Sequence, residues 1–168
     1  MVQIRAASLA ELDAAAELLI AAYLEYASAM PSEAWDAYAM NIADVRGRVA
    51  SSELIVAAEE GELLGCVTFF PEAPKDDGWP AGYSYVRLLG VRPEARGRSI
   101  GKLLMEECVR RARTLGMRYL GLHTTGFMAV ARGMYERMGF ERVPRYDFTP
   151  TPGVVATAYR LALNMDGS

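Results

Sequence analysis

The stretch that decides the fold reads Leu89-Gly90-Val91-Arg92-Pro93-Glu94-Ala95-Arg96-Gly97-Arg98-Ser99-Ile100-Gly101-Lys102. An apolar strand runs into a basic turn, and that turn opens directly into a helix. Such a turn directs unpaired backbone N–H groups and the positive end of a helix dipole at one point, so it can hold a phosphate or pyrophosphate. Gly97 and Gly101 let the backbone approach a ligand closely. Positive charge for a polyanion comes from three side chains, Arg96, Arg98 and Lys102.

Two better-known phosphate loops are excluded by the spacing. A Walker A loop needs four residues between its first glycine and its Gly-Lys pair, and Ser or Thr must follow. Here three residues separate Gly97 from Gly101, and Leu103 follows Lys102. The dinucleotide fingerprint G-x-G-x-x-G is also absent. What remains is the pattern Arg/Gln-x-x-Gly-x-Gly/Ala, with Ser99 where the middle glycine is expected.

With these residues the chain resembles the GNAT superfamily of acyl-CoA-dependent N-acetyltransferases. In that family a strand ending in Leu-x-Val-x-Pro-x-x-Arg-Gly precedes the pyrophosphate turn, and residues 89–97 match it. A second family motif lies downstream as Ala131, Tyr135 and then Gly139-Phe140. Both motifs occur in the family's order, and the resemblance extends over nearly the whole chain.

The order of the expected elements predicts an α/β (α+β) fold. Short strands alternate with helices after a hairpin, which implies a mixed sheet. The resemblance implies a GNAT-like, mostly antiparallel twisted sheet of about seven strands with about four flanking helices. It also implies that the sheet is splayed in the middle, between the strand ending at Val91 and the one beginning at Met117. The expected strands are 3–6, 53–58, 63–70, 83–91, 117–123, 141–148 and 154–163.

Four helical stretches are expected between these strands. The first opens at the capping box Ser8-x-x-Glu11, with Leu9, Leu12, Ala16, Leu19 and Ile20 facing the core. The second is capped by Ser32 and runs to Val49. The third follows the phosphate turn, buries Ile100, Leu103, Leu104, Cys108, Ala112 and Leu115, and stops at Gly116. The fourth covers 128–138.

Composition indicates one domain over residues 1–168. With 168 residues and 52% hydrophobic content, the chain can bury a core without metal or disulfide staples. Cys66 and Cys108 have no ligand-like spacing and there is one histidine, so we expect neither a metal nor a disulfide framework. No leader peptide or membrane span is recognisable, so the expected location is the cytoplasm.

Charge is distributed unevenly along the chain. Residues 86–118 carry nine Lys or Arg and three Glu, whereas residues 1–83 carry four Lys or Arg and fourteen Asp or Glu. The basic segment suits the polyanionic end of CoA. The acidic part could attract a cationic amine or could be solvated surface charge. Basic residues without interleaved aromatics argue against nucleic-acid binding.

The resemblance implies an N-acetyltransferase that moves an acetyl group from acetyl-CoA to a primary amine by direct attack in a ternary complex. The pantetheine amides would pair with the backbone of Leu89 and Val91, and the oxyanion would form near the Val91 N–H. Tyr135 matches the tyrosine assigned as general acid. Acetyl-CoA is then a substrate, no metal is needed, the acceptor is a small-molecule or peptide amine, and a homodimer is compatible. The expected CoA-binding residues are Leu89, Val91, Arg96, Gly97, Arg98, Ser99, Gly101, Lys102 and Ala131.

The general base is left open by the sequence. Tyr85 stands where many relatives carry a glutamate, and it cannot act as a carboxylate base. A bound water, an acceptor that is already partly neutral, or a carboxylate from elsewhere could substitute, with candidates Glu72, Asp76 and Asp77. His123 is either a base or a residue that closes a structural hydrogen bond.

Other features of the sequence leave further questions open at this stage. Ser99 indicates either that the turn tolerates a Cβ or that its φ is negative. Met128 replaces an asparagine found in many relatives. The absent glutamate at position 85 and the serine at position 99 keep open a CoA-binding sensor or interaction module that performs no transfer. Five aromatic residues either line an acceptor pocket or pack in the core: Trp35, Tyr38, Trp79, Tyr83 and Tyr146.

Overall fold

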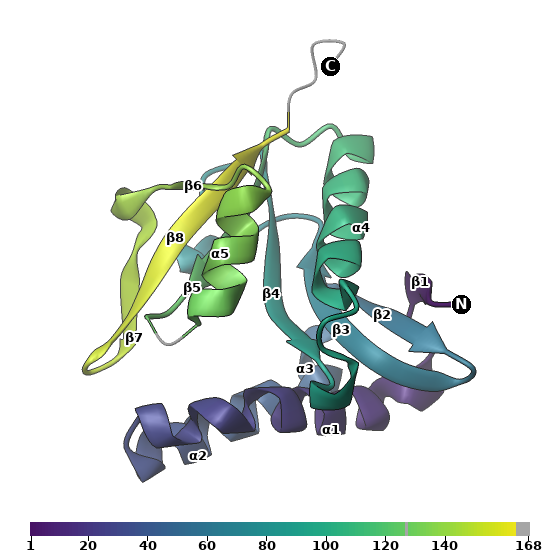
Figure 1. The fold of residues 1–168 in the computed structure, drawn as a ribbon. Coiled ribbons are helices and arrows are strands. Elements are labelled where there is room, and N and C mark those ends of the chain that lie inside the picture. The colour runs from purple at the N-terminus through teal and green to yellow at the C-terminus, as the bar shows by residue number, and fades with distance from the viewer. Residues whose placement is uncertain (127, 164–168) are drawn as a thin grey trace. The chain divides into compact units, whose positions relative to one another are not determined.

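A computed structural model describes residues 1–126 and 128–163 (Figure 1). The chain forms two compact units, and the strand β4 (Tyr83–Val91) and the helix α4 (Ile100–Thr114) contribute to both. The first unit contains residues 1–69 and 88–107, and the second contains residues 70–87 and 108–168. Each unit is described in turn. The expectation of a single domain over residues 1–168 stays a prediction.

The first unit is built on an antiparallel hairpin. Its strands are β1 (Gln3–Ala6), β2 (Glu53–Glu59), β3 (Glu62–Phe70) and the end of β4. β1 pairs with β2, and β2 pairs with β3 through the predicted turn at Glu60-Gly61, where both φ angles are positive. The Arg92 N–H, just after β4, donates to the Leu64 carbonyl at 2.7 Å.

The predicted capping box starts the first helical region. The Ser8 N–H donates to Glu11 Oε1 at 2.9 Å, and the Arg5 guanidinium holds both oxygens of the Glu11 carboxylate. A 3₁₀ turn over Leu9–Glu11 precedes α1 (Leu12–Tyr23). The prediction that Leu9 faces the core was wrong, because the tighter 3₁₀ winding rotates it away and leaves it 76% exposed. The residues of α1 that are buried are Leu12, Ala15, Leu18, Leu19, Ala22 and Tyr23.

The second helical stretch differs from the prediction at both ends. Pro31, rather than Ser32, occupies the N-cap position of α2 (Ser32–Ala43). Asp44 then interrupts the helix, and its carboxylate accepts the Gly47 N–H at 3.1 Å, which starts the short α3 (Val45–Arg48). α3 ends at Arg48, one residue before the predicted end, and Val49 is exposed.

The second unit is organised around β5 (Tyr119–Thr124). Residues Tyr83–Tyr85 of β4 pair in parallel with Tyr119–Gly121, and the whole of β5 pairs antiparallel with β8 (Val154–Ala162). Two short strands, β6 (Glu141–Arg142) and β7 (Phe148–Thr151), pair with β8. The splay of the sheet stays a prediction.

One predicted strand is wrong in this unit. Pro144 has no N–H to give to a ladder, and it begins a 3₁₀ turn over Pro144–Tyr146. The expected strand over 141–148 is therefore divided into β6, this turn and β7. The helix α5 (Ala129–Arg137) lies within the predicted range.

The helix α4 buries a stripe that is shifted from the predicted one. Leu103 and Leu115 are exposed, because a period near 3.6 residues puts Met105 and Val109 on the buried side and because α4 ends before Leu115. Gly116, with a φ of 74°, ends the helix as predicted. The residues of α4 that are buried are Ile100, Leu104, Met105, Cys108, Val109 and Ala112.

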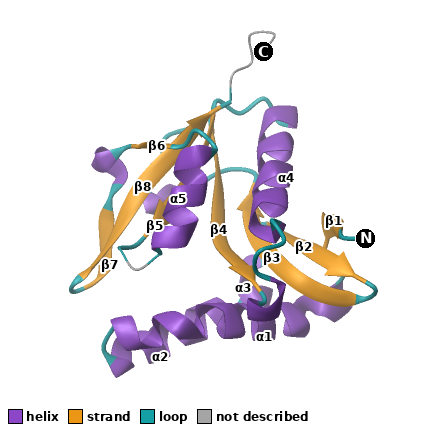
Figure 2. Cartoon of the chain, viewed as in Figure 1, coloured by secondary structure: helices purple, strands orange, loops and turns teal. Residues whose placement is uncertain are grey.

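The predicted fold class is confirmed. Within residues 1–126 and 128–163 there are eight strands and five α-helices (Figure 2), one more of each than expected, and most of the strand pairs are antiparallel. No helix in this part of the chain is long and apolar enough to cross a membrane.

Candidate functional site

In the first unit, the end of β4 is held closely by α1. Leu88 has a φ of 56°, a left-handed conformation that costs energy for a side chain of its size. A Cβ on Gly90 would lie 2.9 Å from Leu19 Cδ2, so only glycine allows α1 to approach the strand at this point. The Tyr23 hydroxyl donates to the Leu89 carbonyl at 2.8 Å. The helix therefore positions the residues just before the turn.

The turn itself is shaped by two left-handed residues. Gly97 has a φ of 84° and Ser99 a φ of 62°. Of the two alternatives for Ser99, the structure supports a tolerated Cβ and excludes a negative φ. The Ser99 carbonyl accepts the Leu103 N–H at 3.1 Å, which makes it the entry to α4. The backbone thus passes from a left-handed turn into the first turn of a 15-residue helix.

The basic side chains of the turn bind the protein's own acceptors. Arg96 donates to Glu25 Oε2 at 2.7 Å and to the Ala22 carbonyl at 3.2 Å. Arg98 donates to both oxygens of Glu59, at 2.9 and 3.0 Å, and this hydrogen bond lowers the pKa of the Glu59 carboxyl. Lys102 is exposed. Both arginines are therefore paired with carboxylates of the protein itself.

In the second unit, the predicted general acid Tyr135 lies on α5 and is buried. Gly139, with a φ of 100°, turns the chain after the helix, and the Phe140 N–H donates to the Tyr135 carbonyl at 3.0 Å. The rings of Tyr135 and Phe140 lie 5.7 Å apart. The Gly-Phe pair of the second motif therefore closes α5 and packs against Tyr135. Ala131, one turn earlier on α5, is half-buried.

Both ring nitrogens of His123 form hydrogen bonds. Nε2 lies 2.9 Å from the Tyr146 carbonyl, and Nδ1 lies 2.7 Å from the Tyr85 hydroxyl. A carbonyl only accepts, so Nε2 carries the hydrogen, and the Nδ1 of the neutral ring accepts from Tyr85. Burial lowers the pKa of His123 below its ordinary value. The carbonyl contact thus places a hydrogen on Nε2, and burial disfavours the charged form of the ring.

Aromatic side chains surround this histidine. The Trp79 ring lies 5.2 Å from His123, 5.8 Å from Tyr85 and 4.8 Å from Tyr146, and it packs on Gly121, which has no side chain. Tyr83 stacks on Tyr119 with 4.8 Å between ring centres. The buried Trp79 and Tyr83 are packing residues, whereas Tyr146 also lines a pocket. Trp35 and Tyr38 pack with each other in the first unit.

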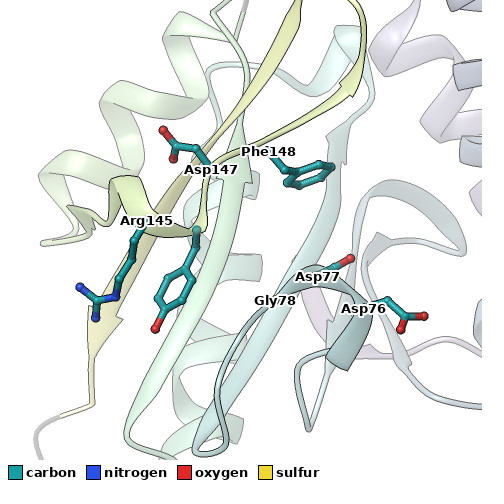
Figure 3. A pocket seen from close by; sticks show the side chains of 7 residues that line it. Asp76, Asp77, Gly78, Arg145, Asp147 and Phe148 are labelled. Carbon is teal, nitrogen blue, oxygen red and sulfur yellow. The ribbon is translucent and has the colours of Figure 1, made fainter.

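The pocket next to this cluster has a volume of about 300 Å³. Figure 3 shows Asp76 and Asp77 on one loop, with Phe148 on the segment facing it and Arg145 directed away. The guanidinium of Arg145 lies over the Tyr146 ring. Burial raises the pKa of the half-buried Asp77 carboxyl. The lining residues are Asp76, Asp77, Gly78, Arg145, Tyr146, Asp147 and Phe148.

The third carboxylate of the pocket is already paired. Arg142 donates to both oxygens of Asp147 at 2.8 Å, and the Ala158 N–H donates to Oδ1 at 2.7 Å. The hydrogen bond from Arg142 is the main reason that the pKa of Asp147 is lowered. Asp76 and Asp77 therefore supply the negative charge of the pocket. Glu72, the other carboxylate suggested by the sequence, is exposed and does not line it.

The pairing of Tyr85 with His123 is the feature that sequence reasoning missed. The two residues are separated by 38 positions, and only the register of β4 with β5 brings them together. Part of the information was in the sequence. In two strands that pair in parallel, directly paired residues and every second residue along each strand lie on one face of the sheet. The register itself could not be read from the sequence.

Comparison with known proteins identifies the family. Residues 13–140 match the profile of the acetyltransferase (GNAT) family. The chain belongs to this family. The resemblance inferred from the two motifs is therefore confirmed.

Three relatives are about one third identical to this GNAT chain over aligned segments of about 100 residues. An uncharacterised N-acetyltransferase of Schizosaccharomyces pombe is 34% identical over 102 residues, which are 61% of this chain and 59% of the relative. A mycothiol acetyltransferase of Propionibacterium freudenreichii is 34% identical over 111 residues, 62% of this chain and 34% of that protein. An IAA acetyltransferase of Azospirillum brasilense is 33% identical over 99 residues, 58% of this chain and 61% of the relative. The chain thus spans less than two thirds of the length of each.

Solved structures of low identity share the fold of this GNAT chain. The PaiA N-acetyltransferase of Thermoplasma acidophilum, in complex with coenzyme A, superposes with a TM-score of 0.76 at 17% identity and covers 96% of this chain and 99% of its own. A GNAT family acetyltransferase of Brucella melitensis, in complex with acetyl-CoA, has a TM-score of 0.68 at 21% identity, with 98% and 89% coverage.

Proposed function

We propose that this protein is an N-acetyltransferase that moves an acetyl group from acetyl-CoA to a primary amine. The observation that carries the proposal is the left-handed turn at Gly97 and Ser99, which leads directly into the N-terminus of a 15-residue helix. Such a turn suits a pyrophosphate, because several N–H donors and the helix dipole act on the same anion. Membership of the GNAT family and the CoA complexes of structural neighbours support acetyl-CoA as the ligand.

The donor site is proposed to depend mainly on backbone groups. The turn would hold the pyrophosphate through Gly97, Ser99 and Gly101, and the strand before it would pair with the pantetheine amides. Arg96 and Arg98 would add charge by exchanging their present carboxylate partners for phosphate oxygens. The proposed CoA-binding residues are Leu89, Val91, Arg96, Gly97, Arg98, Ser99, Gly101, Lys102 and Ala131.

Direct transfer from a thioester to an amine has three requirements. The amine must be neutral, the tetrahedral oxyanion must be stabilised, and the departing thiolate benefits from a proton. We assign the oxyanion to the backbone N–H of Val91 and the proton to the phenol of Tyr135. A phenol with an ordinary pKa of about 10 is a weaker acid than a thiol of about 8.5, so Tyr135 stabilises the thiolate through a hydrogen bond or through partial transfer.

An amine acceptor is supported by the pocket of the second unit. The Asp76 and Asp77 carboxylates attract an ammonium group, and the rings of Tyr146 and Phe148 offer faces for a cation. These features suit a small-molecule or peptide amine that is positively charged before it reacts.

A CoA-binding sensor without transfer is the second candidate. The observation in its favour is Tyr85, which leaves position 85 without a carboxylate. A sensor would bind acetyl-CoA and release no thiol with any amine.

The first experiment is a calorimetric titration with acetyl-CoA, followed by a thiol-release screen over a panel of primary amines. The transferase predicts binding and release. Tyr135→Phe should then lower kcat by at least about tenfold while the Kd for acetyl-CoA stays within about twofold. Tyr119→Phe, which removes a phenol from another element of the same unit, serves as the control and should leave kcat unchanged.

Absence of acetyl-CoA binding would refute both candidates. Binding without release would favour the sensor, and equal kcat in Tyr135→Phe and the wild type would refute the role of Tyr135.

A further inference from the structure

Tyr85 and His123 lie on one face of the second unit. Tyr85 pairs with Gly121, and His123 follows two residues later on the same strand, so all three share a face. Because Gly121 has no side chain, the two rings approach across it, and their centres are 5.6 Å apart. Trp79 covers the gap. The local sequence thus makes room for the 2.7 Å hydrogen bond between the phenol and Nδ1.

The hydrogen bonds of this pair run in one direction. The Tyr146 carbonyl accepts from Nε2–H, and the Nδ1 lone pair accepts from the Tyr85 hydroxyl. A proton that arrives at the Tyr85 oxygen can therefore displace the phenol's own proton onto Nδ1. The pair accepts a proton as a unit, and neither residue has to move.

Charged groups around the ring favour the protonated state once it forms. The Asp77 carboxylate approaches from the loop before β4, and Asp147 approaches from the segment before β7, and both raise the affinity of His123 for a proton. Arg142 holds Asp147, and Arg87 acts on Asp77. The remaining neighbours, Trp79, Tyr146 and Phe148, are aromatic. Burial keeps the ring neutral at rest, and the two carboxylates stabilise the imidazolium that follows.

Tyr135, the proposed general acid, belongs to the face of the sheet opposite the one that carries Tyr85 and His123. The Tyr159 hydroxyl contacts Glu136 of α5 at 3.4 Å, so α5 packs on the face that carries Tyr159. Tyr159 is paired with Leu122, the neighbour of His123, and side chains alternate between faces. A base and an acid on opposite faces cannot exchange a proton directly.

Resting on the proposed acetyl transfer, we propose that Tyr85 and His123 form the proton acceptor for the amine. An N–H proton of the ammonium group passes to the Tyr85 oxygen while the phenolic proton passes to His123 Nδ1. The freed nitrogen lone pair forms the C–N bond and the C–S bond breaks. The acylated nitrogen then loses its second surplus proton, which ends on the departing sulfur that Tyr135 stabilises, so the products are the amide and the CoA thiol. His123 later returns its proton to solvent. Tyr85 is the catalytic residue of this pair, and His123 acts through it.

The pH dependence of kcat/KM for the amine tests this pair. If the wild-type enzyme removes the proton from the ammonium group, kcat/KM should be constant between the pKa of His123 and the pKa of the amine, which is about 10. Tyr85→Phe and His123→Asn should lower kcat about 100-fold at pH 7. In both variants kcat/KM should rise about tenfold per pH unit up to the pKa of the amine, because only free amine reacts. Asn retains an acceptor for the phenol but does not titrate.

A matched control removes a neighbouring phenol. Tyr83 lies two residues earlier on the same face of β4, and its oxygen accepts from Arg160 at 2.6 Å instead of contacting His123. Tyr83→Phe should keep the wild-type plateau. A plateau that survives in Tyr85→Phe and His123→Asn would overturn the proposal. Absence of thiol release by the wild type would instead refute the proposed function, and the pair with it.

A second measurement does not depend on the enzymatic activity of the protein. His123 is the single histidine, so nuclear magnetic resonance of tag-free protein reports its tautomer and pKa without ambiguity. We expect the Nε2–H tautomer and a pKa below 6.5, lowered further in Asp77→Asn because a stabilising carboxylate is lost. A resting ring with its proton on Nδ1 would overturn the proposal, since the phenol would then have no acceptor.

Discussion

The turn between Leu88 and Lys102 and the face around His123 are built in different ways. The turn is one continuous segment whose shape depends on backbone angles, with positive φ at Leu88, Gly97 and Ser99. The His123 face combines side chains from β4, β5, the loop before β4 and the turn before β7. Main-chain donors tolerate changes of side chain, whereas proton transfer depends on individual atoms. Substitutions should therefore act through the backbone in the first region and through single contacts in the second.

The largest effect is expected from Gly101→Glu in the turn. Gly101 is the second residue of α4, and a carboxylate there would occupy and repel the pyrophosphate. We expect the Kd for acetyl-CoA to rise by at least about 100-fold in calorimetric titration. Leu9→Glu adds the same charge at a position that is 76% exposed and should leave the Kd unchanged. Retained binding by Gly101→Glu would refute the phosphate site.

On the face around His123, Gly121→Ala should disturb packing instead of ligand binding. The new Cβ would lie 3.1–3.2 Å from three ring carbons of Trp79, so the indole has to move. We expect a loss of about 1–3 kcal/mol in the free energy of unfolding measured with urea. Gly126→Ala is the control, because a Cβ there meets nothing within 4 Å. Equal unfolding midpoints for the two variants would show that the packing of Trp79 does not require a glycine at position 121.

Two substitutions of Ser99 separate backbone conformation from side-chain chemistry. Ser99→Gly removes the cost of a left-handed residue, so we expect about 1 kcal/mol of added stability and a Kd for acetyl-CoA within about threefold of the wild type. Ser99→Val places a β-branched residue at a φ of 62° and should weaken binding by about tenfold. Equally weak binding by both variants would mean that the hydroxyl, instead of the backbone, binds the ligand.

The smallest effects are two losses of stability at different pH values. Arg5 lowers the pKa of Glu11 from 4.5 to about 2, so its stabilisation is complete above pH 4.5 and is lost as the pH falls toward 2. Burial lowers the pKa of His123, so its stabilisation is complete above pH 6.5 and declines below that value. Each should be under about 1 kcal/mol.

Urea midpoints between pH 3 and 8 for Glu11→Gln and His123→Asn would separate these contributions. Glu11→Gln should flatten the dependence of stability on pH below pH 4.5 only, and His123→Asn should flatten it just below pH 6.5 only. The same pH profile in both variants would contradict the assignment.

Some elements could be predicted because their signals are local. The strand over residues 83–91, the hairpin turn at Glu60-Gly61 and the capping box at Ser8 each depend on residues within one element. Predictions failed where the chain changed winding within a stretch: Leu9 lies in a 3₁₀ turn, Asp44 divides two helices, and Pro144 divides two strands. Periodicity assumes uniform winding, so it misassigns the residues on either side of such changes.

The sequence by itself determined the family, the fold class and the presence of a turn of the kind that binds phosphate. These depend on neighbouring residues whose spacing can be read directly. Only the tertiary structure decided that Arg98 pairs with Glu59. It also decided that Tyr85, which stands where many relatives carry a carboxylate, forms a hydrogen bond with His123. Those contacts join residues 38 or more positions apart. Their geometry follows from strand register and packing, which arise from the whole chain and not from any one segment.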